Sequence, residues 1–290
     1  MKKTNNNPKI VVVTPIHNGL QHTLPYLKSV KGTGYANLEV IIVDDGSDDG
    51  SAEAIKKYFP ETIILPGDGN LWWTGATNLG VKEALKRDAD YVFTINNDVT
   101  LHKDIFKSLI ACSNDNLKTL IGCKIYYTND KKRVWYFGGQ LDSSIGDIRM
   151  SNGEDEDFPD REETGALTGM GVLVPIGAFD AIGLYDFKNF PHYLADSDFS
   201  LRAKAAGYKL MVDPDSKVYS DVGSSWLRKA LKRPTPSFFW ALFFKDRSPH
   251  SIKIRYRFNK RYWPKQKYRM LFRYYWLLAT KIIRPNAIID

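Results

Sequence analysis

The stretch Lys9-Ile-Val-Val-Val-Thr14, closed by Pro15, decides the fold class of this chain. It is a continuous run of apolar, mostly β-branched residues, which is typical of a strand buried on both faces of a parallel sheet. Similar runs lie at 38–43, 62–65 and 91–95, and segments with helical periodicity lie between them at 23–30, 51–58 and 75–86. Because strand and helix alternate, the sequence predicts an α/β domain with a mostly parallel central sheet.

The pattern is looser in the middle of the chain. A helix is predicted at 101–113 and strands at 120–127 and 133–137, followed by an acidic, glycine-rich stretch at 143–163 and further short elements at 169–174, 176–182, 196–206, 208–212 and 217–219. Cys112 and Cys123 fit neither a zinc spacing nor a disulfide framework, so we expect two buried, reduced thiols.

Polar residues follow three of the predicted strands, in Thr14-Pro-Ile-His-Asn-Gly19, Val43-Asp-Asp-Gly-Ser-Asp-Asp-Gly50 and Asn96-Asn-Asp-Val99. Ligands of open α/β sheets bind outside the carboxyl ends of the strands, so these clusters predict one crevice. A carboxylate beside a ring-shaped side chain can hold a nucleobase, and a carboxylate after the fourth strand can hold a cation. Neither a dinucleotide-binding fingerprint nor the Gly-Lys pair of a phosphate loop is present in the sequence.

Six sequence blocks, in this order, resemble those of glycosyltransferase family 2, the large inverting class with the GT-A fold that builds bacterial polysaccharides. They are Val13-Thr-Pro-Ile-His-Asn18, Val43-Asp-Asp-Gly-Ser47, Asn70-Leu-Trp-Trp-Thr-Gly-Ala-Thr-Asn-Leu-Gly80, Asn96-Asn-Asp98, Gly169-Met-Gly-Val-Leu-Val174 and Tyr193-Leu-Ala-Asp-Ser-Asp-Phe-Ser-Leu-Arg-Ala-Lys-Ala-Ala-Gly-Tyr208. The resemblance covers about residues 8–225 and implies a GT-A fold followed by a helical C-terminal extension.

The resemblance also implies a donor site. Pro15 and His17 would border the nucleobase, with His17 where many relatives have Tyr, and Asp45 would accept a hydrogen bond from the base. The donor-binding residues it implies are Pro15, His17, Asn18, Asp44, Asp45, Trp73, Gly75, Asn78, Asn96 and Asn97. The alternatives are a core position for the two tryptophans at 72 and 73 and a loop or helix-capping role for Asp44 and Asp45.

The metal motif of the fold usually has two acids flanking one residue, and this chain departs from it. Asn96 replaces the first acid and Asp98 keeps the second, as in rhamnosyltransferase-like members of the family. One carboxylate together with the donor phosphates still suffices for Mg²⁺ or Mn²⁺. Asp221 stands near a position where relatives often have His, and we expect it to be a second ligand. The alternative for Asp98 is an acid that caps the following helix.

For the catalytic base the resemblance points to Asp196, which would take the proton of the acceptor hydroxyl. The acid that precedes this position in relatives is Ala195 here. The acceptor-binding residues implied are Trp72, Gly169, Met170 and Asp198. The alternative for Asp196 and Asp198 is a purely structural one, because carboxylates in the first turn of a helix are stabilised by its free N–H groups.

These residues together imply an inverting, metal-dependent glycosyltransferase. It would move a hexose from a dTDP, UDP or GDP sugar to a saccharide acceptor, which can be lipid-linked, in cell-surface polysaccharide biosynthesis; Asn96 favours dTDP-rhamnose. A sugar-nucleotidyltransferase is the enzymatic alternative, although its Lys-bearing, glycine-rich loop is replaced by Pro15-Ile-His-Asn-Gly19. The non-enzymatic alternative, suggested by Asn96 and Ala195, is a membrane scaffold that binds nucleotide without turnover.

The net charge of +8 divides unevenly between residues 1–225 and the tail, residues 226–290. The tail holds 17 of the 41 basic residues but only two acidic ones, a net of +15, so residues 1–225 carry −7. It also holds 15 of the 38 aromatic residues, which excludes a solvated polybasic arm. Prolines divide the tail into about three helices.

Aromatic rings interleaved with cations favour an anionic membrane surface as the partner of the tail, over a second copy of the chain or nucleic acid. No apolar run reaches the length of a membrane span, and the amino terminus lacks the apolar core of a signal peptide. We therefore expect a cytoplasmic protein that is peripheral on the inner face of the cell membrane.

Overall fold

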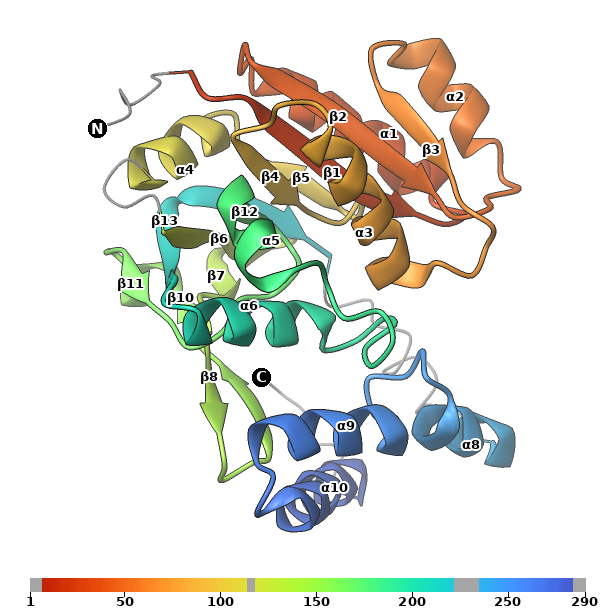
Figure 1. Ribbon diagram of the computed structural model, residues 1–290, viewed down its shortest axis with the longest axis vertical. Coiled ribbons are helices and arrows are strands. Elements are labelled where there is room, and N and C mark those ends of the chain that lie inside the picture. Colours follow the sequence, from red (N-terminus) through yellow and green to blue (C-terminus); the bar gives the residue numbers. More distant parts are fainter. Residues whose placement is uncertain (1–6, 114–117, 222–234, 284–290) are drawn as a thin grey trace.

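A computed structural model describes residues 7–113, 118–221 and 235–283, and places a central sheet between two layers of helices (Figure 1). The sheet runs in the order β10-β7-β6-β12-β4-β1-β2-β3. These strands are β10 (Gly153–Glu154), β7 (Asp130–Tyr136), β6 (Thr119–Tyr127), β12 (Val172–Pro175), β4 (Tyr91–Thr94), β1 (Ile10–Ile16), β2 (Leu38–Asp44) and β3 (Ile63–Pro66).

The sheet is mixed and largely parallel. Strands β4, β1, β2 and β3 are all parallel, and β12 joins them antiparallel to β4. Along its whole length β6 pairs in parallel with β13 (Lys209–Ser220), which also pairs with β5 (Val99–Leu101) and β11 (Glu162–Glu163). A separate hairpin is formed by β8 (Gly139–Asp142) and β9 (Asp147–Met150), and a 3-10 turn, η1, spans Asp155–Asp157. The predicted α/β class with a mostly parallel central sheet is confirmed.

Both faces of the sheet are buried, as the apolar run of β1 predicts. Val11 and Val13 belong to one core cluster, while Ile10 and Val12 belong to another on the opposite face. The first cluster includes residues of α3 (Trp72–Leu85), α5 (Ile176–Ile182) and α6 (Ala195–Ala205), and the second includes residues of α1 (Leu20–Gly32), α2 (Ser51–Tyr58) and α4 (Ile105–Ser113). A Cβ on Gly80 of α3 would lie 2.4 Å from the Val13 side chain, so glycine allows this helix to approach β1 closely.

Several predicted boundaries differ from the observed ones. The helix predicted at 75–86 begins three residues earlier, at Trp72, because the carboxylate of Asp45, which follows β2, binds the N–H groups of Leu71 and Trp72. Leu101 belongs to β5 and the next helix begins only at Ile105. The two strands predicted at 208–212 and 217–219 are one strand, β13, with a register shift between Asp213 and Lys217.

The tail contains three helices in its described part, as predicted: α8 (Pro236–Phe244), α9 (Ile252–Tyr262) and α10 (Lys267–Ile283). They lie together below the sheet domain, beside the β8–β9 hairpin (Figure 1). Ile254 and Phe258 of α9 belong to the first core cluster, so the tail shares a hydrophobic core with the sheet domain. The domain boundary expected at residue 225 lies outside the described residues.

Two further expectations concern the whole chain. Cys112 and Cys123 are buried free thiols, as predicted. Within the described ranges, no helix combines the length and the apolar character that crossing a membrane requires.

Candidate active site

The polar ends of β1, β2 and β4 meet at one edge of the sheet. The three strands are adjacent and parallel, so their carboxyl ends necessarily lie side by side. Two adjoining cavities open at this edge, and five residues line both of them: Pro15, His17, Trp73, Asn97 and His192. The crevice predicted from the strand ends is therefore present.

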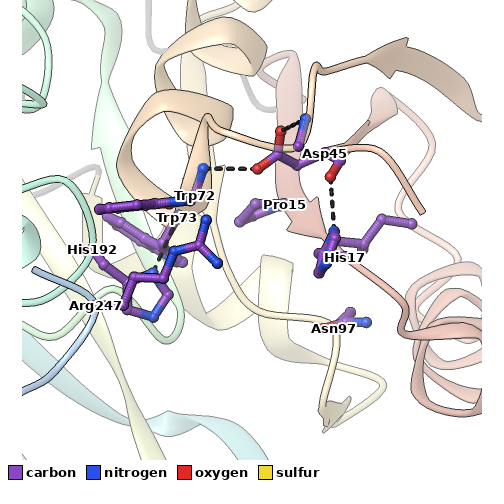
Figure 2. A pocket seen from close by; sticks show the side chains of 10 residues that line it. Pro15, His17, Asp45, Trp72, Trp73, Asn97, His192 and Arg247 are labelled. Atoms are coloured by element: carbon purple, nitrogen blue, oxygen red, sulfur yellow. Dashed lines mark hydrogen bonds between the residues drawn. The ribbon is translucent and has the colours of Figure 1, made fainter. Parts of the chain in front are cut away.

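The first cavity, about 190 Å³, contains the residues that the family resemblance places around a nucleobase (Figure 2). Its lining is completed by Ile16, Asp45, Gly69, Trp72 and Arg247. The Nδ1 of His17 lies 2.8 Å from the backbone carbonyl oxygen of Asp45. Since a carbonyl can only accept, Nδ1 carries a proton.

The carboxylate of Asp45 organises the loop that precedes α3. One oxygen accepts from the N–H groups of Gly69 at 2.9 Å and Leu71 at 3.2 Å, and the other accepts from the N–H of Trp72 at 2.8 Å. Three donors around one carboxylate satisfy backbone groups that a helix start leaves without partners. Asp45 thus fixes the beginning of α3 at the wall of the first cavity.

Trp72 and Trp73 stand in the first turn of α3 with different surroundings. The Trp73 indole N–H donates to the side-chain oxygen of Asn96 at 2.9 Å, and its ring meets Tyr185 edge-on at 5.4 Å. A Cβ on Gly169 would lie 2.5 Å from the Trp73 ring, so this position requires glycine. Trp72 has a φ of 53°, a strained value for so large a residue, and such strain is often found at binding sites.

The second cavity, about 630 Å³, contains the acids expected to act in catalysis and metal binding. It is lined by the five shared residues and by Asn18, Gly19, His22, Asn96, Asp98, Trp135, Thr168, Gly169, Met170, Tyr193, Leu194, Asp196 and Asp221. Leu194, just before α6, has a φ of 67°, another strained backbone position at the site. The cavity joins acids from three separate parts of the chain.

Asp196 is held in position by its neighbours. One carboxylate oxygen accepts from the Gly169 N–H at 2.8 Å and from the Thr168 hydroxyl at 3.4 Å, and the other accepts from the Ser197 N–H at 2.7 Å. Desolvation raises the pKa of the Asp196 carboxyl above its usual range, although these hydrogen bonds oppose the shift. A fixed carboxylate with a raised pKa, open to a cavity, has the properties of a general base.

Asp98 and Asp221 are brought together by strand pairing. In the antiparallel ladder of β5 and β13, Ser220 lies opposite Val99, so the residues just beyond this pair, Asp98 and Asp221, are neighbours. Desolvation raises the pKa of Asp98, and the negative charge of Asp221 acts in the same direction. The sequence places these two acids 123 positions apart, and only the ladder shows that they share a site.

The two carboxylates of Asp98 and Asp221 suit a divalent cation only if a bound molecule supplies further oxygen atoms. Among the described residues, no group of three or more His, Cys, Asp or Glu side chains gathers as a metal centre would require. Mg²⁺ and Mn²⁺, however, keep several waters and bind through one or two carboxylates and substrate phosphate oxygens. The residues therefore fit a cation that is completed by a diphosphate.

Residues 11–182 match the family model described as Glycosyl transferase family 2. The chain belongs to glycosyltransferase family 2. An uncharacterized glycosyltransferase of Rickettsia typhi is 24% identical over 64% of this family 2 chain and 56% of its own length. The N-acetylglucosaminyl-diphospho-decaprenol L-rhamnosyltransferase of Mycobacterium tuberculosis is 24% identical over 71% of this chain and 74% of its own. The chain thus spans about half the length of the Rickettsia relative.

Solved structures share the GT-A fold with this family 2 chain. GalNAc-T7, crystallised with UDP, GalNAc and Mn²⁺, aligns with 74% of this chain and 44% of its own at a TM-score of 0.60 and 17% identity. Residues 1–349 of S. aureus TarS, in complex with UDP, align with 73% of this chain and 60% of their own at a TM-score of 0.53 and 16% identity. At such identities the likeness establishes the fold alone.

Four expected site residues of this family 2 chain line neither cavity. Asp44 accepts from the Ser47 N–H within its own loop, and Gly75 packs against the Phe187 ring. Asn78 exchanges two hydrogen bonds with the backbone of Tyr185. Asp198 is completely buried and bound by Arg202, Arg261 and Tyr262. In each case the side chain or the close packing has a partner within the protein and faces neither cavity.

Trp72, which we expected to bind the acceptor, lines the first cavity and not the second.

The sequence interpretation missed other residues of the site. His192 lines both cavities, and burial together with the positive charge of Arg247 lowers its pKa to about 4, so the ring is neutral at physiological pH. His192 directly precedes the family-like block at 193–208, and this position in the sequence is the signal that could have identified it. Arg247 comes from the tail, where it is one of many cations and carries no distinguishing pattern.

Proposed function

We propose that this chain is an inverting, metal-dependent glycosyltransferase that moves a hexose from a nucleoside-diphosphate sugar to a saccharide acceptor. The observation that carries the proposal is the continuity of the two cavities. The first has a ring and a carboxylate from the ends of β1 and β2, and the second has Asp98 and Asp196. A donor lying across both would have its base in the first cavity and its anomeric carbon within the second.

The proposed reaction is a single displacement. The acceptor hydroxyl attacks the anomeric carbon from the face opposite the nucleotide, forming the new C–O bond while the bond to the diphosphate oxygen breaks. Asp196 takes the hydroxyl proton, and the configuration at the anomeric carbon inverts. Asp98 and Asp221 would hold the divalent cation, which supplies stabilisation of negative charge on the departing diphosphate.

Rhamnose is the sugar that we favour, with dTDP as its carrier and UDP or GDP as alternatives. Asn96, in place of the first acid of the metal motif, supports this choice, as does the relative from M. tuberculosis, which is named an L-rhamnosyltransferase. That relative's name also includes a sugar diphosphate of decaprenol, which supports a lipid-linked acceptor and a role in cell-surface polysaccharide assembly. Gly169 and Met170 line the second cavity, where such an acceptor would approach.

A lipid-linked acceptor agrees with a membrane-associated tail, which we include in the proposal. Large aromatic side chains are exposed on α8 and α10, namely Trp240, Phe244, Tyr268, Phe272 and Trp276. On α10 the last three are spaced four residues apart and therefore share one face. Exposed aromatic rings beside cations are typical of surfaces that bind anionic lipid, so the protein would work on the inner face of the cell membrane.

Nucleotide binding and turnover test the proposal in two steps. Thermal stabilisation by UDP, dTDP and GDP, each with and without Mn²⁺, is expected for at least one nucleotide and to be larger with the metal. The corresponding sugar nucleotide should then be hydrolysed slowly with Mn²⁺, faster than without protein. If no nucleoside diphosphate stabilises the protein, the proposed function is wrong, and stabilisation without turnover favours the scaffold alternative.

A further inference from the structure

One cation of the tail reaches the first cavity. Arg247 lies between the end of α8 at Phe244 and the start of α9 at Ile252, outside the region that matches the family model. Its guanidinium carbon lies 4.3 Å from the centre of the Trp72 ring. Figure 2 shows it directed into the cavity beside Trp72, Trp73 and His192. A residue of the C-terminal extension therefore forms part of the donor-side wall.

Neighbouring cations of the tail have partners in the sheet domain. Arg255 pairs with Asp147 at 2.5 Å, and Arg261 pairs with Asp186 at 2.7 Å and with the buried Asp198. Arg257 donates to backbone carbonyl oxygens at 3.2 and 3.3 Å. These contacts hold the tail against the sheet domain, and each of the three guanidinium groups is paired with a carboxylate or a carbonyl oxygen.

The charge of Arg247 has no such partner. Within the described part of the chain it forms neither an ion pair nor a hydrogen bond, only the stacking contact with Trp72. Its acidic neighbour Asp246 is engaged by Lys253 at 2.6 Å. The indole N–H of Trp72 is buried and finds no acceptor among the described residues, so it is not accessible to a ligand. At this wall of the cavity, the guanidinium of Arg247 is therefore the donor that a ligand can reach.

Among the described residues that line the first cavity, Asp45 carries the one carboxylate, and three backbone N–H groups already bind it. His192 is neutral, as described above. Arg247 is exposed, so its guanidinium is accessible to a ligand in the cavity. The planar guanidinium, with its paired donors, matches phosphate oxygens in geometry and charge.

We propose that Arg247 binds the diphosphate of the nucleotide donor, so that the basic tail completes the donor site; this inference rests on the proposed function. The cation would neutralise part of the charge that collects on the leaving diphosphate. Asn96 leaves the metal site with one carboxylate fewer than the usual motif, and a guanidinium from the tail supplies positive charge to the same phosphates. In this chain the C-terminal extension and the catalytic domain would form one binding site.

Calorimetric titration of the full chain with a nucleoside and with its diphosphate separates phosphate binding from base stacking. Arg247→Gln is expected to weaken diphosphate binding about tenfold to hundredfold, as removal of a charge-assisted hydrogen bond does, and to change nucleoside affinity less than about twofold. Arg247→Lys should retain an intermediate affinity for the diphosphate, since it keeps the charge without the fork of donors. Lys245→Gln, an exposed cation of the same loop that lines neither cavity, is the matched control and should bind both ligands normally.

Two results would overturn the inference. Equal losses for nucleoside and diphosphate would assign Arg247 to base stacking or to the shape of the cavity, and unchanged diphosphate affinity in Arg247→Gln would remove it from the site. Both require that the unsubstituted protein binds the diphosphate. If it does not, the proposed function itself fails, so the two failures are distinguishable.

Discussion

At the scale of single residues, Asp196 combines two properties that are seldom found together in a structural acid. Its oxygens are fixed by the N–H groups of Gly169 and Ser197, yet the carboxylate lines a cavity large enough for a sugar. We predict that Asp196→Asn lowers the transfer rate by about 10²- to 10⁴-fold, the usual contribution of a positioned base. Nucleotide affinity, measured by calorimetry on the same variant, should be preserved. Near-normal turnover would exclude Asp196 as the base.

The raised pKa of Asp196 has a consequence for the pH dependence of the reaction. The base acts only when ionised, so the rate should fall as the pH is lowered through its pKa, which lies above the ordinary aspartate value of about 4. The acid limb of a profile of kcat/KM against pH is therefore expected above that value. Thr168→Val removes a hydrogen bond to the carboxylate and should move the limb further toward neutral pH. A limb at or below the ordinary value contradicts the assignment.

A substitution at Asn96 tests which residues form the proposed metal site. The side-chain oxygen of Asn96 accepts from the Trp73 indole at 2.9 Å, a bond that an aspartate would keep. Asn96→Asp should therefore lower the Mn²⁺ concentration for half-maximal activity by roughly tenfold, because ligand charge count sets cation affinity. Asn97→Asp is the control with the same added charge, since the Asn97 side chain donates to Thr23 of α1 instead. An equal effect of both variants would mean that charge alone, without coordination, is responsible.

At the scale of elements, helix α6 connects the active site to the tail. Its first turn carries Asp196 at the cavity and, two residues later, the fully buried Asp198, which accepts from Arg202 of α6, Arg261 of α9 and the Tyr262 hydroxyl at 2.7 Å. The contact between α9 and Asp198 therefore acts directly on the helix that carries the proposed base, Asp196.

We predict that Arg261→Met lowers the free energy of unfolding by roughly 2 kcal/mol, the value of a hydrogen bond to a charged group, because Asp198 loses one of two cationic partners. Urea unfolding followed by circular dichroism measures this. The control is Lys31→Met, which removes a largely exposed pair with Glu61 and should cost less than about 1 kcal/mol. A loss in Arg261→Met no larger than that of the control would mean that Asp198 is not a structural link.

The sequence predicts those elements that have a local pattern and fails where contacts between distant residues decide the structure. Buried parallel strands such as β1 are continuous apolar runs, and the polar clusters at their ends are predictable because parallel strands end at one edge. The sequence predicts a later start for α3 than the one observed, because a carboxylate distant in sequence, that of Asp45, binds the N–H groups at the beginning of the helix. Arg247 and the proximity of Asp98 to Asp221 depend on tertiary contacts and strand register, which local patterns do not encode.

At the scale of the whole molecule, the tail has one side that packs on the sheet domain and one side that is exposed. Arg255, Arg257 and Arg261 bind the acidic sheet domain, and Ile254 and Phe258 join its core. Removing the tail would therefore expose that core, so truncation is a poor test of membrane binding. What remains outward is the α10 face with Tyr268, Phe272 and Trp276, 67%, 69% and 61% exposed. Such a surface can be altered without disturbing the fold.

We predict that the double variant Phe272→Ser, Trp276→Ser sediments with anionic vesicles at least about tenfold more weakly than the unsubstituted protein, because both rings would lie at headgroup depth. Its melting temperature should be unchanged, since neither ring is buried.

A second double variant, Lys265→Gln with Arg269→Gln, removes exposed cations of the same region. It should weaken binding to anionic vesicles only, and less so at high salt, because salt screens the attraction of these cations to anionic lipid. Equal sedimentation with anionic and neutral vesicles, or an unaffected aromatic double variant, contradicts a membrane partner. If light scattering finds instead that the aromatic variant converts a dimer to a monomer, the face belongs to a second copy of the chain.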